Sequence, residues 1–197
     1  HGVIPGAQFL RDINMGKKVD LKGKKVVVVG AGNVAMDAAR SARRLGAELV
    51  TVVYRRRRED MPAAEEEIKA AEEEGIHFQY LVAPIEVVGE GGRMTGLKCL
   101  RMQLGEPDAS GRRRPVPVEG SEFIVEAQTL IPAIGQRPDL SFITESSGMD
   151  ISRWNTLNVN RETFMTNVPG VFSAGDVETG PDIAIRACAG GRKAAMG

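Results

Sequence analysis

The chain has 197 residues, which is enough for one ordinary domain or two small ones with a buried core. Lys and Arg together number 26, as do Asp and Glu, so the formal net charge is zero and neither nucleic-acid binding nor an acidic tail is indicated. The longest purely aliphatic run, residues 26–29, is too short to cross a membrane, so no membrane partner is expected. Two distant cysteines, Cys99 and Cys188, exclude a disulfide framework, a cysteine zinc cluster and a Cys-x-x-Cys pair within this chain.

The two ends suggest a piece of a longer protein. The chain opens on His1 with no signal-peptide pattern, and it stops at Gly197 inside an expected helix. Unpaired cysteines and the lack of a visible targeting segment favour the cytoplasm.

The first third of the chain has the pattern of a strand, a helix and a second strand. Residues 26–29 are all valine, which is typical of a buried parallel strand, and residues 33–45 carry apolar side chains on one helical stripe up to a C-cap glycine, Gly46. Residues 49–54 form a second aliphatic run. Together they predict a right-handed βαβ unit, while residues 1–22 show no strong period.

The middle of the chain changes from helix to antiparallel strands. Pro62 and Gly75 bracket a predicted helix with an acidic face, and apolar side chains then alternate over residues 76–82 as in a strand. Residues 85–125 have the texture of antiparallel strands, with a hairpin turn at Gly91-Gly92 and a longer one over residues 106–111. Further elements are expected at 129–135 (strand), 171–174 (strand) and from about 183 onward (helix, in which Cys188 is expected to be a packed small residue).

A dinucleotide-binding loop is predicted between the first strand and the first helix of that unit. Residues 30–35 match G-x-G-x-x-A at the required place. Gly30 allows the tight turn, Gly32 lets the backbone approach a pyrophosphate, and Ala35 permits close packing of helix on strand. The helix N-terminus offers free N–H groups to the phosphates. The alternative is a glycine-rich turn without a ligand.

The end of the second strand indicates which nucleotide is bound. NAD-binding folds usually carry a carboxylate there for the ribose 2′-hydroxyl, whereas this strand continues into Arg55 and Arg56. A guanidinium fork suits a 2′-phosphate, which favours NADPH. The alternative is a solvated arginine loop, and Arg57 and Arg58 fit that description better than Arg55 and Arg56.

A third candidate lies near the end of the chain. Gly175 and Asp176 follow the predicted strand at 171–174, where a carboxylate can accept a sugar hydroxyl, and the next helix N-terminus can stabilise negative charge. Taken alone, a Gly-Asp pair is also a common turn.

Several short strings occur together in this chain. They are VGAGNVAMD at 29–37, VYRR at 53–56, MPA at 61–63, LGEPD at 104–108, GRRRPVP at 111–117, AIGQRP at 133–138 and GVFSAGDV at 170–177. In this order and spacing they resemble the small (beta) subunits of NADPH-dependent glutamate synthase and their flavoprotein relatives. These relatives include the reductase half of dihydropyrimidine dehydrogenase and the large subunit of electron-bifurcating transhydrogenase.

The resemblance implies an FAD domain into which an NADPH domain is inserted. Residues 23–135 would form the NADPH-binding domain, and residues 1–22 and 136–197 would belong to the FAD domain. We therefore expect an α/β fold: a Rossmann-like three-layer NAD(P)-binding domain with an antiparallel excursion, followed by the C-terminal part of an FAD-binding domain. The implied cofactor-binding residues are Gly30, Ala31, Gly32, Asn33 and Val34 for the NADPH pyrophosphate, Arg55 and Arg56 for its 2′-phosphate, Ala133, Ile134 and Gly135 beside its nicotinamide end, and Gly175, Asp176, Ile183 and Ala184 for FAD.

The implied activity is transfer of a hydride from NADPH to FAD, from which electrons pass singly to iron–sulfur centres. The cysteine ligands of those clusters and the primary FAD glycine loop of the family lie outside this chain, so the chain alone is expected to be inactive. No protein acid or base is needed, and no catalytic side chain or metal ligand is predicted. The implied partner is the glutamate synthase large subunit or another electron-acceptor subunit. The alternatives are a transhydrogenase or ferredoxin-linked NADPH reductase of the same build, and a non-catalytic NADP(H)-binding module.

Overall fold

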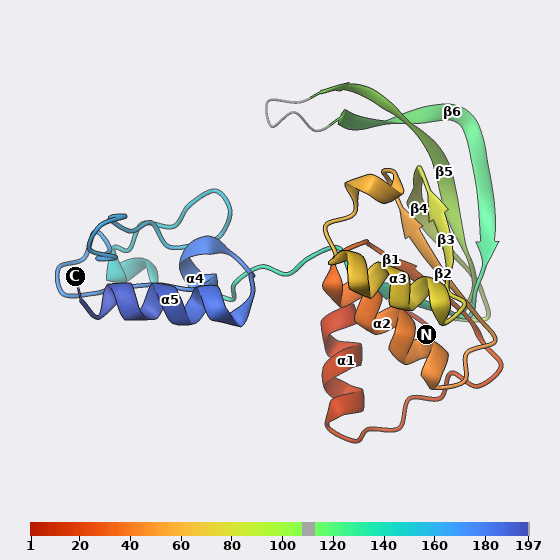
Figure 1. Cartoon of the computed structure of the whole chain (residues 1–197), viewed down its shortest axis with the longest axis horizontal. Helices are drawn as coiled ribbons and strands as arrows, with labels where there is room; N and C mark the ends of the chain where they lie inside the picture. Colours follow the sequence, from red (N-terminus) through yellow and green to blue (C-terminus); the bar gives the residue numbers. More distant parts are fainter. Residues whose placement is uncertain (108–112, 197) are drawn as a thin grey trace. The chain divides into compact units, whose positions relative to one another are not determined.

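A sheet of four parallel strands forms the centre of the first part of the molecule (Figure 1). The structure, a computed structural model, describes residues 1–107 and 113–196 of the chain. The strand order is β3-β2-β1-β7, and every neighbouring pair is parallel. The two inner strands, β1 and β2, cover the valine run and residues 49–54, so the strands predicted at 26–29 and 49–54 are confirmed. The bounds are β1 (Lys25–Val29), β2 (Leu49–Tyr54), β3 (His77–Tyr80) and β7 (Thr129–Pro132).

Helices cover one face of this sheet. Val26 and Val28 point to that face and pack with Phe9, Met36 and Ile68 in one buried cluster. Alternate side chains of a strand point to opposite faces, so the valine run serves two layers at once. The helices of this layer are α1 (Gly6–Asn14), α2 (Asn33–Arg44) and α3 (Glu65–Glu73).

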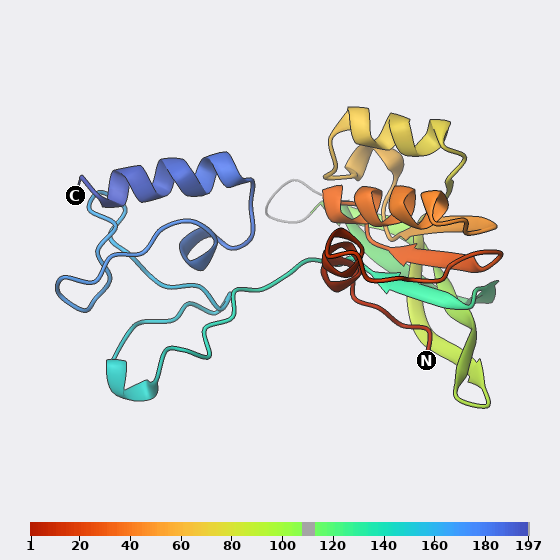
Figure 2. The same ribbon diagram turned by 90° about the horizontal axis from the view of Figure 1, so that it is seen from below.

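An antiparallel sheet covers the other face and completes the three predicted layers (Figure 2). Val27 and Val29 pack with Leu97, Cys99 and Val125 of this sheet. Strands pair in the order β4-β5-β6, and Glu90 opposite Arg93 confirms the predicted Gly91-Gly92 turn. The bounds are β4 (Val82–Glu90), β5 (Arg93–Pro107) and β6 (Arg113–Glu126); the longer turn predicted over 106–111 falls largely outside the described residues.

Two predicted boundaries in this region are wrong. The helix expected from Pro62 begins at Glu65, because Ala64 is its N-cap and has an extended backbone (φ −62°, ψ 140°). The amides of Ala63 and Ala64 bond to Ala31 and Asn33 and hold the segment in this course. The strand expected over 76–82 is broken at Leu81, whose φ of +55° ends β3 and turns the chain into β4. Helix α1 was not predicted, and β7 ends three residues before the expected Gly135.

The chain divides by its internal contacts into two compact units, His1–Ile134 and Gly135–Gly197. The second unit has a small buried set that includes Leu140 and Leu157. The strand predicted at 171–174 is wrong: only Met165 and Phe172 form a bridge there, within a narrow turn in which the Ser173 amide binds the Phe164 carbonyl. The regular elements of this unit are η2 (Glu145–Ser147), α4 (Asp176–Thr179) and α5 (Ala184–Ala194), and the last confirms the predicted late helix.

No helix within the described ranges is long and apolar enough to span a membrane.

Candidate functional site

The loop that joins β1 to α2 passes between the ends of β2 and β7. Gly30 donates its N–H to the Val53 carbonyl at 3.1 Å, and the Ala133 N–H donates to the Val29 carbonyl at 2.7 Å. Gly30 has a φ of +134°, and a Cβ at this position would lie 2.3 Å from the Ala133 carbonyl oxygen. Only glycine fits this conformation and this contact. The turn therefore depends on the first glycine of the motif.

The second glycine leaves the start of α2 open. Gly32 is the N-cap of α2, and a Cβ built there would have only the Pro62 Cγ, at 4.0 Å, within contact distance. The amides of Asn33 and Val34 lie in the first turn, where no carbonyl within the helix is available to them. No acidic side chain stands in that turn. The helix dipole and these amides form a site suited to an anion.

The buried alanines of the motif hold the loop to the layers around it. Ala31 and Ala35 are 4% and 0% exposed. Ala31 accepts a hydrogen bond from the Ala63 amide at 3.1 Å, while the Asn33 side-chain oxygen accepts one from the Ala64 amide at 3.0 Å. The segment before α3 is thus bonded to both sides of Gly32. The sequence did not predict these contacts, which join residues about thirty positions apart.

The arginine run after β2 divides into paired and available members. Arg57 binds Glu59 and Asp60, and Arg58 reaches α3 to bind Glu65 and Glu72, with Nε 2.9 Å from the Glu72 carboxylate. These hydrogen bonds raise the pKa of Arg58.

The other two arginines keep donors free for a ligand. Arg56 uses its Nε to bind the Arg113 carbonyl at 3.2 Å, and no hydrogen bond of its terminal nitrogens occurs in the described part of the chain. Arg55 is exposed and has no ion pair among those same residues. Arg55 and Arg56 follow the end of β2, where NAD-binding folds usually carry a carboxylate for the ribose 2′-hydroxyl. This edge of the sheet therefore presents guanidinium groups to whatever binds beside α2.

The end of β7 lies against the same loop. Ala133 is half-buried beside Gly30, Ile134 is 78% exposed, and Gly135, with a φ of +105°, begins the second unit.

The N-terminus of α1 reaches this place too. A Cβ on Gly6 would lie 3.2 Å from the Ala133 Cβ and 3.4 Å from a Val34 methyl. Sequence reasoning missed this part of the site, although Phe9 and Ile13, four positions apart after Pro5, are a short helical signal.

In the second unit, the predicted flavin residues lie at two helix starts. Gly175, with a φ of +72°, is the N-cap of α4, and Asp176 is its exposed first residue. The Asp176 carboxylate accepts a weak hydrogen bond from the Asp182 amide at 3.4 Å. Ile183 caps α5, and Ala184 is its first residue. These residues offer an exposed carboxylate and the N-terminus of α5.

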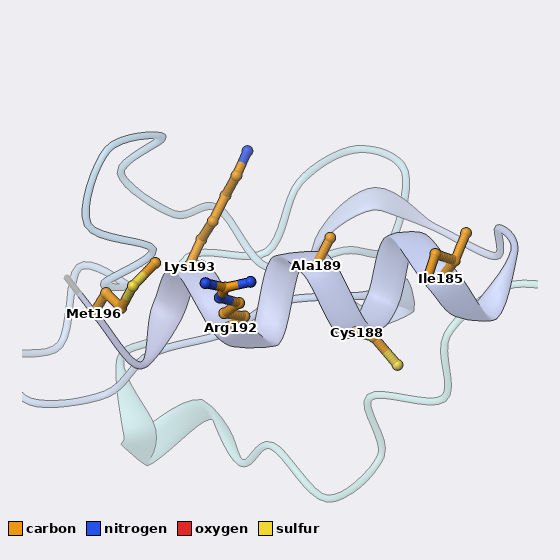
Figure 3. Close-up of a pocket in the computed structure, with 6 residues that line it drawn as sticks. All are labelled: Ile185, Cys188, Ala189, Arg192, Lys193 and Met196. Atoms are coloured by element: carbon orange, nitrogen blue, oxygen red, sulfur yellow. The ribbon is translucent and has the colours of Figure 1, made fainter.

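Helix α5 exposes a face with a shallow pocket (Figure 3). It has no buried side chain, and Ile185 is 70% exposed. Cys188 is exposed on this face, so the prediction that it packs as a small residue is wrong. Cys99, by contrast, lies in the core, where burial raises the pKa of its thiol to about 11. No cluster of metal-binding side chains occurs in residues 1–107 and 113–196.

Comparison with known proteins gives the family. The profile of the pyridine nucleotide-disulphide oxidoreductases matches residues 2–191. The chain is 49% identical to the NADP(+)-dependent formate dehydrogenase subunit beta of Moorella thermoacetica, over 99% of this chain and 27% of that protein. It is 48% identical to the NADPH-Fe(3+) oxidoreductase subunit beta of Geobacter sulfurreducens, over 94% of this chain and 30% of that protein. It is 44% identical to the small chain of glutamate synthase [NADPH] of Azospirillum brasilense, over 89% and 36%. The chain thus spans well under half the length of these relatives.

Solved structures share the fold. Thioredoxin reductase from T. acidophilum superposes with a TM-score of 0.73 at 25% identity, covering 99% of this chain and 56% of that one. FprA from Mycobacterium tuberculosis in complex with NADPH gives a TM-score of 0.67 at 20% identity, over 89% of this chain and 51% of that one.

Proposed function

Because the chain belongs to the pyridine nucleotide-disulphide oxidoreductase family, we propose that its first unit binds NADPH for a larger flavoprotein oxidoreductase. The observation that carries this proposal is an open helix N-terminus at Gly32 together with the Arg55 guanidinium, which has no ion pair among the described residues. A pyrophosphate suits the first feature and a 2′-phosphate suits the second.

Each group of residues then has one task in holding the nucleotide. The backbone of residues 31–34 binds the pyrophosphate, and Arg55 and Arg56 bind the 2′-phosphate. Residues 133–135 run beside the nicotinamide end. The nicotinamide supplies the hydride when NADPH is bound, so the chain itself needs only to bind and orient it. No side chain of this site has to move a proton.

In the intact protein, we propose that the hydride goes to FAD and that electrons leave through iron–sulfur centres to a partner subunit. The names of the three relatives, which are beta subunits or small chains that use NADPH or NADP, support the nucleotide and the partner subunit in this proposal, and the family supports the flavin. Identity is 49% to the formate dehydrogenase subunit and 44% to the glutamate synthase small chain, so the partner subunits of both kinds of enzyme are candidate partners. The glutamate synthase large subunit is the partner that the sequence motifs favour. We expect the protein to act in the cytoplasm.

The second unit contributes part of the flavin site in this proposal. Gly175 and Asp176 would meet the ribityl-phosphate portion of FAD, and the start of α5 at Ile183 and Ala184 would face the flavin ring. A helix N-terminus there favours negative charge on the reduced flavin.

Calorimetric titration of the purified chain tests the nucleotide assignment. We expect NADPH to bind more tightly than NADH by roughly ten- to a thousandfold, because one or two charge-assisted hydrogen bonds contribute about 1.5–3 kcal/mol each. Equal affinity for the two nucleotides, or binding of neither, would contradict the proposal.

A further inference from the structure

A four-residue segment lies across the beginning of α2. Residues 61–64 separate η1 (Arg58–Asp60) from α3, in the gold connection of Figure 1. Ala63 donates its amide to Ala31, and Ala64 donates to the side-chain oxygen of Asn33. Pro62 stands between them, 4.0 Å from the place where a Cβ of Gly32 would be. The segment is thus bonded to Ala31 and Asn33, the residues on either side of Gly32.

Both ends of the segment are held by side chains. Before it, the Tyr54 hydroxyl donates to the Asp60 carbonyl at 2.7 Å, which fixes η1 to the end of β2. After it, Arg58 bonds to Glu65 and Glu72 and so fixes η1 to α3. Hydrogen bonds therefore fix the residues that flank the segment on both sides. The side chain that bonds it to α2 is that of Asn33.

We infer that Asn33 is a positioning residue for the pyrophosphate site. Its side-chain oxygen binds the Ala64 amide. In this inference the bond fixes the start of α2, where the Asn33 and Val34 amides have no partner within the helix. The inference rests on the proposed function, since it concerns the same site. The inference gives the backbone and the side chain of Asn33 different roles. The backbone amide binds the pyrophosphate, and the side-chain oxygen binds the Ala64 amide.

Residues 55–64, which include this segment, connect the two phosphate-binding places. Arg55 and Arg56 begin the connection that Ala64 ends. The bond to Asn33 acts at the pyrophosphate end, where NADPH and NADH are identical. Loss of that bond should therefore weaken both nucleotides alike and leave the preference between them unchanged. A residue that contacted the 2′-phosphate would instead change the preference.

The test combines amide hydrogen exchange of the free chain with calorimetry. In Asn33→Ala we expect faster exchange at the Ala64 amide without nucleotide, because its acceptor is gone. Affinity for NADPH and for NADH should each fall about two- to tenfold, the effect of one ordinary hydrogen bond. Asn33→Asp keeps an acceptor oxygen and should keep slow exchange at Ala64. Asn14→Ala, at the exposed end of α1, is the matched control and should match the wild type in both measurements.

Two results would overturn the inference. One is unchanged affinity for both nucleotides in Asn33→Ala. The other is a loss of affinity with unchanged Ala64 exchange, which would make the Asn33 side chain a direct phosphate ligand. Failure of the wild-type chain to bind either nucleotide would instead remove the proposed function, and the inference with it.

Discussion

The backbone of Gly30 lies so close to Ala133 that a Cβ on residue 30 would come within 2.3 Å of the Ala133 carbonyl oxygen. This close approach fixes the glycine loop to the end of β7, the strand that runs toward the second unit. The two glycines of the motif therefore have different physical roles. Gly30 is required for the fold of the loop, whereas Gly32 leaves space for a ligand.

Gly30→Ala should destabilise the first unit by at least about 2 kcal/mol, because it combines an overlap with a backbone oxygen and a φ that L-residues rarely adopt. Urea denaturation gives the difference in the free energy of unfolding. Gly32→Ala is the matched control: its φ is −87° and its Cβ has room, so it should unfold within about 1 kcal/mol of the wild type. Equal stability of the two variants would show that the close approach does not matter.

Gly32→Val should abolish binding of both NADPH and NADH while the chain stays folded. A branched side chain would occupy the position of the pyrophosphate and cover the first amides of α2. Calorimetry measures the binding, and circular dichroism with urea denaturation checks the fold. Wild-type NADPH affinity in a folded Gly32→Val chain would mean that the loop is only a turn.

Arg55→Ala and Arg56→Ala should each lower the ratio of NADPH to NADH affinity, by about tenfold or more for every charge-assisted hydrogen bond that the substitution removes. Affinity for NADH should change little, since it lacks the 2′-phosphate. Arg57→Ala is the control, because this arginine is already engaged with Glu59 and Asp60. A ratio that neither Arg55→Ala nor Arg56→Ala changes would contradict the assignment of NADPH.

Local patterns predicted the elements whose burial is simple. The valine run of β1 packs on both faces, so its strand was evident, and the stripe of α2 with Gly46 after it indicated that helix. The start of α3 was missed because the backbone stays extended as far as Ala64, in a segment held by bonds to Ala31 and Asn33, far away in the sequence. Residues 171–174 have strand composition but form one bridge only, at Phe172.

The candidate site shows the same division between local and distant effects. The glycine motif and Arg55 could be named from spacing alone. Arg58 differs from Arg55 because it pairs with Glu65 and Glu72. These two glutamates lie two helical turns apart on the same face of α3. The approach of Gly6 to Val34 and Ala133 joins segments from three parts of the chain, and no local pattern contains it.

Acid should weaken the junction between α2 and α3. Hydrogen bonds from Arg44 and Arg40, at 2.6 and 2.9 Å, hold the pKa of Glu74 below its usual range. A lowered folded-state pKa stabilises the fold above the ordinary glutamate pKa of about 4.3, and this contribution is lost as the pH falls through the folded-state value. Glu74→Gln should therefore be less stable than the wild type at neutral pH, and the difference should shrink below about pH 4.

Urea denaturation at a series of pH values from neutral to acid measures this change. Glu73→Gln is the control, because Glu73 is exposed and has no ion pair in the portion of the chain that the structure describes. It should stay near the wild type at every pH. A Glu74→Gln deficit that is constant with pH would assign the loss to packing and not to charge.

The 197-residue chain should bind no FAD. Its sequence contains a single G-x-G-x-x-A loop, at residues 30–35, which we assign to NADPH. In the second unit, the proposed flavin site has only the exposed carboxylate of Asp176 and the start of α5 at Ile183. Few groups remain to hold so large a ligand, so the purified chain should be colourless and should not reduce a dye with NADPH.

Gel filtration after incubation with excess FAD, followed by the absorbance spectrum of the protein fraction, measures the retained flavin. A yellow protein with close to one FAD per chain would refute the prediction and show that the second unit suffices. Asp176→Ala would then decide where that flavin sits: loss of the colour would place the carboxylate in the flavin site. Retention of the colour would remove Asp176 from that site, because a sugar hydroxyl without its acceptor would bind more weakly.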